Sequence, residues 1–103
     1  MRLLRRKNWN VFILKKEQLF IMSRVAIVTG AGTGVGKATA VKLSDVGYTV
    51  ILIGRREDKL EETKKACNAQ AIVIPMDVSI EADVKKCFEM VENRFSRIDV
   101  LFN

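Results

Sequence analysis

The 103-residue sequence contains no histidine, only one tyrosine and only one proline. The absence of histidine excludes imidazole acid–base chemistry and the common zinc sites. The two cysteines, Cys67 and Cys87, do not form a C-x-x-C pair. This favours small buried side chains over a disulfide or a metal site, and we predict no metal site. No apolar run approaches the length of a membrane-spanning helix, so we also expect no membrane partner.

The net charge of +6 is concentrated at the N-terminal end of the chain. Residues 1–24 hold seven basic side chains and one acidic one, whereas residues 25–103 hold eleven of each. Most of the chain is therefore neutral on balance and offers no electrostatic argument for a nucleic-acid partner.

Composition changes abruptly near Met22, which suggests that residues 1–21 are a basic extension outside the fold. The apolar run Val11–Leu14 is too short for a secretory signal. A mitochondrial presequence and a surface-binding amphipathic helix are alternatives. We expect translation to begin naturally at Met22, residues 22–103 to form one domain, and the protein to be cytoplasmic.

Residues 29–36 read TGAGTGVG and follow a short β-branched segment. Glycines at the start of a helix expose backbone N–H groups near the positive end of its dipole, which suits a pyrophosphate. The NTPase pattern G-x-x-x-x-G-K-[ST] fails at Ala31 and Ala38, and G-x-G-x-x-G fails at Val35 and Lys37. The spacing that fits is T-G-x-x-x-G-x-G.

Strand and helix patterns then alternate along the whole chain. Apolar runs predict strands over residues 24–29, 48–53, 71–75 or 71–76, and 98–102. Helical periodicity predicts helices over about 35–46, about 57–68 and after Ser79. Gly47 fits a helix C-cap and Ser79 an N-cap. The pattern predicts an α/β fold, a doubly wound, Rossmann-like parallel sheet with strand order 3-2-1-4, ending after its fourth strand.

The residue type at the end of the second strand discriminates between dinucleotides. An acidic residue there would bind the ribose hydroxyls of NAD, whereas a basic one accommodates the 2′-phosphate of NADP. Ile53-Gly54 is followed by Arg55 and Arg56, with no acidic residue before Glu57. The segment therefore favours NADP over NAD, although two solvated arginines in a turn are the alternative.

Two further segments complete a resemblance to the short-chain dehydrogenase/reductase family. Asp77-Val78 follows the third strand, and the fourth strand ends in Asn103, like the first residue of the family's Asn-Asn-Ala-Gly. The resemblance covers Arg24–Asn103. It implies that Asp77 and Val78 hold the adenine and that the glycine turn holds the pyrophosphate. The predicted cofactor-binding residues are Thr29, Gly30, Gly32, Thr33, Gly34, Val35, Gly36, Arg55, Arg56, Asp77, Val78 and Asn103.

Within the glycine turn, Gly30 and Gly32 are expected to allow the tight turn. Gly34 would let the backbone reach the pyrophosphate, and Gly36 would let the following helix lie close to the first strand. NADP-preferring members of the family often carry a second basic residue in this turn. Thr33 occupies that position in this chain.

The family's catalytic Ser, Tyr-x-x-x-Lys pair and Asn, and its oligomerisation helices, would all lie after residue 103. The only tyrosine, Tyr48, is followed four positions later by Leu52, so we predict no catalytic residue in this chain. It then corresponds to the N-terminal, cofactor-binding part of an oxidoreductase that transfers hydride between NADP and a small carbonyl or alcohol substrate. By itself it would be inactive and, with its fourth strand exposed, only marginally stable. The alternative is a non-catalytic nucleotide-binding module that acts as a sensor or an interaction protein.

Overall fold

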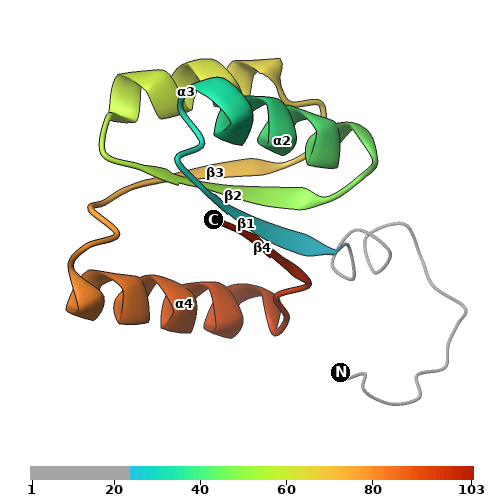
Figure 1. Cartoon of the computed structure of the whole chain (residues 1–103). Coiled ribbons are helices and arrows are strands. Elements are labelled where there is room, and N and C mark those ends of the chain that lie inside the picture. The colour runs from blue at the N-terminus through green and yellow to red at the C-terminus, as the bar shows by residue number, and fades with distance from the viewer. Residues whose placement is uncertain (1–23) are drawn as a thin grey trace, which may run out of the picture.

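The computed structural model describes residues 24–103, and the predicted extension over residues 1–21 lies outside this part. Four parallel strands form one sheet with helices on both faces (Figure 1). Helices α2 and α3 cover one face, and α4 covers the other. The elements are β1 (Val25–Thr29), α2 (Gly34–Asp45), β2 (Thr49–Gly54), α3 (Glu57–Ala66), β3 (Ala71–Pro75), α4 (Glu81–Phe95) and β4 (Val100–Phe102).

The strand order is β3-β2-β1-β4, which confirms the predicted fold class and the predicted order. β2 pairs with β1 on one side and with β3 on the other, so its backbone lies in the middle of the sheet. Its side chains from Thr49 to Ile53 are all buried. A run that is apolar on both faces of a strand is what helices on both sides of a parallel sheet require.

Alternate residues of the central strands contribute to two separate cores, one on each face of the sheet. On β2, Val50 and Leu52 face α2 and α3, whereas Ile51 and Ile53 face α4. The first core includes Ala26, Val28, Ala40 and Leu60, and the second includes Val25, Ile27, Cys87 and Val91.

Helix ends follow the prediction in one case and depart from it in another. Gly47 has φ +102° just after α2, and its N–H donates to the Ser44 carbonyl oxygen at 3.0 Å, as expected of a C-terminal glycine. Ser79 is not the N-cap of α4, and that prediction was wrong. Ile80 occupies the cap, while the N–H and hydroxyl of Ser79 both donate to Asp77 Oδ1. The Asp77 carboxylate accepts the hydrogen bonds of Ser79, so the Ser79 hydroxyl does not cap the N-terminus of α4.

The two cysteines are free. Cys87 lies on the buried face of α4, as predicted, whereas Cys67 is only partly buried at the end of α3. Burial raises the pKa of both thiols above the ordinary value.

Asp99 attaches β4 to the start of β1. Its Oδ2 accepts the Val25 N–H at 2.8 Å, and its own N–H donates to the Val25 carbonyl oxygen at 2.8 Å. Arg97 donates to both oxygens of the same carboxylate. Partial burial raises the pKa of Asp99, but the hydrogen bonds from Arg97 and Val25 and the charges of Arg97 and Arg24 bring it below its ordinary value.

Thr63 attaches α3 to the turn after β1. This buried hydroxyl donates to the Ala31 carbonyl oxygen at 2.8 Å and lies 3.3 Å from the carbonyl oxygen of Lys59 in its own helix. On the other side of the peptide chain, the Ala31 N–H donates to the Ile53 carbonyl oxygen at 3.0 Å. The glycine-rich turn is thus fixed to β2 and to α3.

We expect Thr63→Val to lower the free energy of unfolding by about 1–2 kcal/mol, because the buried Ala31 carbonyl loses its hydroxyl donor while the packing volume is kept. Urea unfolding followed by circular dichroism measures this change. Thr39→Val, the same substitution at a half-buried position of α2, is the control. Equal effects of the two substitutions would show that the Thr63 hydrogen bond contributes nothing specific.

We expect Asp99→Asn to weaken the pH dependence of stability. A carboxyl whose pKa is depressed by folding stabilises the native state above its unfolded pKa, and this contribution is lost as the pH falls through the folded pKa. The unaltered chain should therefore lose more stability between about pH 5 and pH 2 than the variant does. Urea midpoints across this pH range test the idea, and parallel curves for the two proteins would contradict it.

Candidate functional site

The predicted site residues gather at one edge of the sheet, where all four parallel strands end. Thr29 is the last residue of β1, Arg55 directly follows β2, and Asp77 and Asn103 lie just beyond β3 and β4. Because carboxyl ends of parallel strands meet at one edge, these positions become neighbours although they are widely spaced in the sequence.

Strand register brings two pairs of these residues into contact. β1 and β4 are aligned so that Val28 lies opposite Phe102, and the Thr29 hydroxyl donates to Asn103 Oδ1 at 2.8 Å. β2 and β3 are aligned so that Gly54 lies opposite Pro75. Just beyond the ends of these two strands, Arg55 Nη1 lies 3.8 Å from Asp77 Oδ2.

Gly30, Gly34 and Gly36 each occupy a position in the turn that favours glycine, and the approach of a pyrophosphate at Gly34 stays a prediction. Gly30 and Gly34 have φ +61° and +58°, a conformation that side chains disfavour, and a Cβ added to either would point into open space. At Gly36, an added Cβ would lie only 2.0 Å from the Gly30 carbonyl oxygen. The start of α2 therefore packs directly against the turn.

Gly32 serves a different purpose from the one predicted. Its φ is not positive, so the tight turn does not depend on it. An added Cβ would instead lie 2.8 Å from the Cβ of Lys59 in α3. Glycine at this position allows the N-terminal part of α3 to lie against the turn.

The N-terminus of α2 differs electrostatically from those of the other two helices. Its first turn carries no acidic residue, whereas α3 begins with Glu57 and Asp58 and α4 carries Glu81 and Asp83. Thr33 is the N-cap residue and makes no side-chain capping hydrogen bond. The partial positive charge of this helix end therefore faces the open side of the turn without a carboxylate beside it, which favours an anion.

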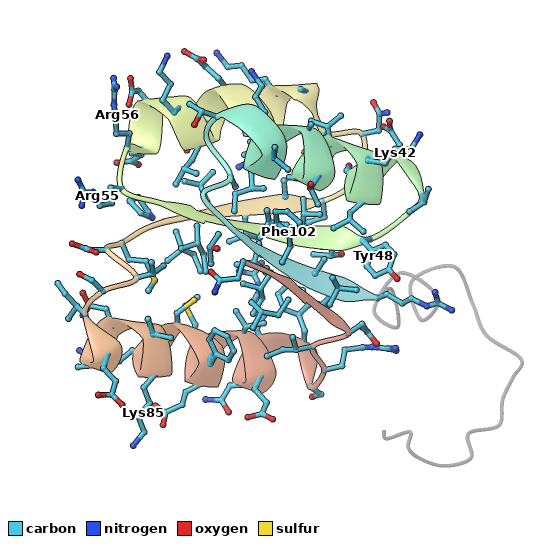
Figure 2. All side chains as sticks on the ribbon, in the orientation of Figure 1. Lys42, Tyr48, Arg55, Arg56, Lys85 and Phe102 are labelled. Atoms are coloured by element: carbon cyan, nitrogen blue, oxygen red, sulfur yellow. The ribbon has the colours of Figure 1, made fainter. Side chains whose placement is uncertain are left out.

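A groove of about 140 Å³ lies between the glycine turn and the end of β2. Pockets for whole small molecules are larger, roughly 300–1,000 Å³, so this groove fits part of a ligand. Arg55 and Arg56 project from the same end of the molecule (Figure 2). The groove is lined by Gly30, Gly32, Thr33, Gly54, Arg55, Arg56, Lys59 and Leu60.

Lys59 is a lining residue that the sequence analysis missed. In the sequence it is one of several charged residues on a strongly polar helix, and nothing distinguishes it from Lys64 or Lys65. The distinguishing feature is spatial, because only the contact of its Cβ region with Gly32 brings it to the groove.

Asp77 is held as an ionised acceptor. Its Oδ1 accepts the Ser79 N–H at 2.9 Å and the Ser79 hydroxyl at 2.7 Å. These two bonds lower the pKa of Asp77 below its ordinary value, and the Arg55 guanidinium lowers it further. Oδ2 faces Arg55 at the longer distance. Val78, the other predicted adenine contact, is exposed.

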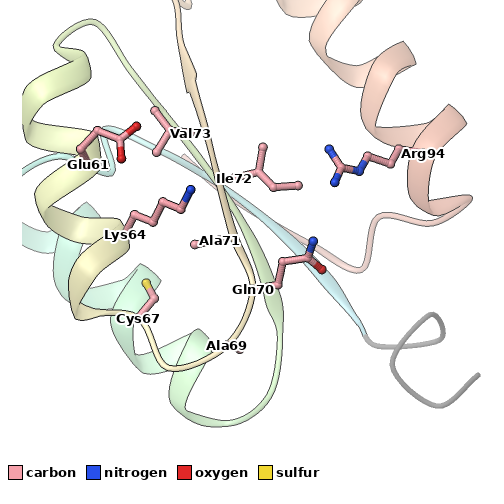
Figure 3. Close-up of a pocket in the computed structure, with 9 residues that line it drawn as sticks. All are labelled: Glu61, Lys64, Cys67, Ala69, Gln70, Ala71, Ile72, Val73 and Arg94. Carbon is pink, nitrogen blue, oxygen red and sulfur yellow. The ribbon is translucent and has the colours of Figure 1, made fainter. Parts of the chain in front are cut away.

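A larger hollow of about 690 Å³ lies along the outer edge of β3, between α3 and α4 (Figure 3). Lys64 and Arg94 approach it from opposite sides of the strand. None of the predicted site residues line it. Across residues 24–103 we find no cluster of side chains that could hold a metal ion and no helix long and apolar enough to cross a membrane.

Sequence comparison identifies relatives over the same part of the chain. The family described as short chain dehydrogenase matches residues 24–103. The uncharacterized oxidoreductase SERP2049 of Staphylococcus epidermidis is 36% identical over 83 residues, which is 81% of this chain and 36% of that protein. The uncharacterized oxidoreductase Lmo0432 of Listeria monocytogenes is 40% identical over 85 residues, 80% of this chain and 34% of the relative. The chain thus spans about a third of the length of these relatives.

Solved structures lead to the same family. A metagenomic short-chain oxidoreductase in complex with NADP superposes with a TM-score of 0.73 at 33% identity, covering 79% of this chain and 38% of that one. YwfH, described as an NADPH dependent reductase of bacilysin biosynthesis, also gives a TM-score of 0.73 at 33% identity, with coverages of 77% and 35%. Together with the glycine turn and the strand order, these matches show that the chain belongs to the short-chain dehydrogenase family of oxidoreductases.

Proposed function

We propose that residues 24–103 bind the adenosine half and the pyrophosphate of NADP, as the cofactor-binding part of an oxidoreductase. The observation that carries the proposal is the pair of arginines at the end of β2, beside the glycine turn and without an acidic residue before Glu57. A cation at this position suits the 2′-phosphate, whereas NAD lacks that phosphate and would favour an acidic residue.

The residues present fit a dinucleotide. Gly30 and Gly34 leave open space above the turn, so a pyrophosphate can approach its backbone, and no carboxylate opposes it at the start of α2. Arg55 would neutralise the 2′-phosphate, and Asp77 would accept a hydrogen bond from the adenine amino group. When bound, the nicotinamide supplies the hydride-transfer chemistry. The chain's own part in that reaction is to hold and orient the cofactor.

The proposed reaction of the whole protein is hydride transfer between NADP and a small carbonyl or alcohol substrate. Support comes from relatives described as an NADPH dependent reductase and as a short-chain oxidoreductase in complex with NADP. Within residues 1–103 no tyrosine is followed four positions later by a lysine, so this part does not contribute the family's acid–base pair.

Charge reversal at Arg55 tests the cofactor preference. We expect Arg55→Asp to weaken NADP binding by about 1–3 kcal/mol and to leave NAD binding nearly unchanged, because only NADP carries the 2′-phosphate. Titration calorimetry with both dinucleotides measures the two affinities. Lys42→Asp, the same charge reversal at the opposite end of the molecule (Figure 2), is the control. Equal losses for NADP and NAD would show that Arg55 only shapes the turn.

We further expect the 103-residue chain to bind NADP without turning over a carbonyl or alcohol substrate, since it holds no phenol–lysine pair to move the proton that accompanies hydride transfer. Nicotinamide absorbance during incubation with a panel of aldehydes, ketones and alcohols is the measurement. A variant with alanine at both Gly34 and Gly36 gives the background rate. Turnover above that background would contradict the expectation and would require another acid–base group in this chain.

A further inference from the structure

The groove beside the glycine turn has a third cationic residue, in addition to the two arginines expected from the sequence. Lys59 lies in the first turn of α3, and its N–H donates to the Arg56 carbonyl oxygen at 3.1 Å. The three cations come from one short segment, in which Arg55 and Arg56 connect β2 to α3 and Lys59 lies in the helix. All three line the groove together with Gly32 and Thr33.

The backbone of Lys59 is fixed from three sides. Gly32 lies directly against its Cβ, and the next residue, Leu60, is fully buried beneath Gly54. One turn further along the helix, the Thr63 hydroxyl bonds to the Ala31 carbonyl oxygen. These contacts hold the first turn of α3 against the glycine turn. The backbone and Cβ of Lys59 therefore stay beside the groove, even where the rest of its side chain changes conformation.

The ion pairs of the three cations differ in the distance between their charged atoms. Arg56 Nη2 lies 3.1 Å from Asp58 Oδ2, a hydrogen-bonded pair. Lys59 Nζ lies 4.0 Å from Glu62 Oε1, and Arg55 Nη1 lies 3.8 Å from Asp77 Oδ2. Exposed pairs at such distances contribute little, so Lys59 and Arg55 can change partner at little cost. Arg56 is more firmly engaged.

The turn itself contributes no cation, because residues 29–36 contain neither lysine nor arginine. A 2′-phosphate is close to a dianion at neutral pH, and one guanidinium leaves part of that charge unbalanced. A second cation across the groove from the turn would balance it.

We propose that Lys59 is a specificity-determining residue that contacts the 2′-phosphate of NADP together with Arg55, because the glycine turn on the same groove supplies no cation. This inference rests on the proposed function, and it assigns a role to a residue of α3 that lies outside the glycine turn and the end of β2.

The test compares Lys59→Met with the unaltered chain. Methionine keeps a long apolar side chain beside Gly32 and removes only the charge. The probes are adenosine 2′,5′-bisphosphate and adenosine 5′-monophosphate, which differ by the 2′-phosphate. We expect Lys59→Met to weaken binding of the bisphosphate about tenfold and binding of the monophosphate less than about twofold. Lys59→Arg should retain most of the preference, and Lys65→Met, a charge removal at an exposed position of the same helix, should leave both affinities unchanged.

The outcomes separate this inference from the proposed function. Equal weakening of both nucleotides by Lys59→Met, or the same effect from Lys65→Met, would overturn the role of Lys59 and leave the nucleotide site intact. Failure of the unaltered chain to bind either nucleotide would overturn the proposed function itself, and the inference with it.

A second measurement needs no variant, which keeps the inference testable if Lys59→Met fails to fold. In the unaltered chain, acetylation of individual lysines can be followed by mass spectrometry with and without each nucleotide. The bisphosphate should slow acetylation of Lys59 and leave Lys65 unaffected, whereas the monophosphate should slow neither. A Lys59 that reacts at the same rate with and without the bisphosphate would contradict the proposed contact.

Discussion

The backbone of Ala31 joins the three elements that form the site. Its N–H donates to the Ile53 carbonyl oxygen at the end of β2, and its carbonyl oxygen accepts the hydroxyl of Thr63 in α3. Ala31 itself belongs to the turn that leaves β1. The two backbone groups of this one buried residue thus fix the glycine turn against the end of β2 and against α3. Both groups are buried, so leaving either unpaired would be costly.

The charge distribution around the glycine turn favours an anion on one side only. Acidic residues occupy the first turns of α3 and α4, where they stabilise the helix ends in the ordinary way. The first turn of α2 has none, and Gly36 brings it directly against the glycine turn. The N-terminal turn of α2 thus lacks the stabilisation that an acidic residue would give. An anionic ligand above the turn would restore the missing interaction.

Much of the fold and part of the site could be predicted from the sequence because both follow local patterns. Apolar runs located the strands, and right-handed crossovers fixed their order, which brings Arg55 and Asp77 to one edge. What the sequence did not reveal depends on contacts between elements. Lys59 is indistinguishable from its helical neighbours until Gly32 is seen against it. Ser79 was predicted as a helix cap because serine often fills that role. In the structure its N–H and hydroxyl donate to Asp77 instead, a contact that the sequence pattern does not reveal.

Arg55 and Asp77 face each other at the edge of the sheet, and their ion pair can separate without loss of the position of Asp77. The two side chains are proposed to hold different parts of one cofactor, and in the structure they face each other at 3.8 Å. The pair is exposed, most of all at Arg55, so it contributes little to stability and costs little to separate. Asp77 is fixed independently by Ser79, and its position does not depend on Arg55. The Arg55 guanidinium can therefore leave the carboxylate for a phosphate while Asp77, the proposed adenine acceptor, stays in place.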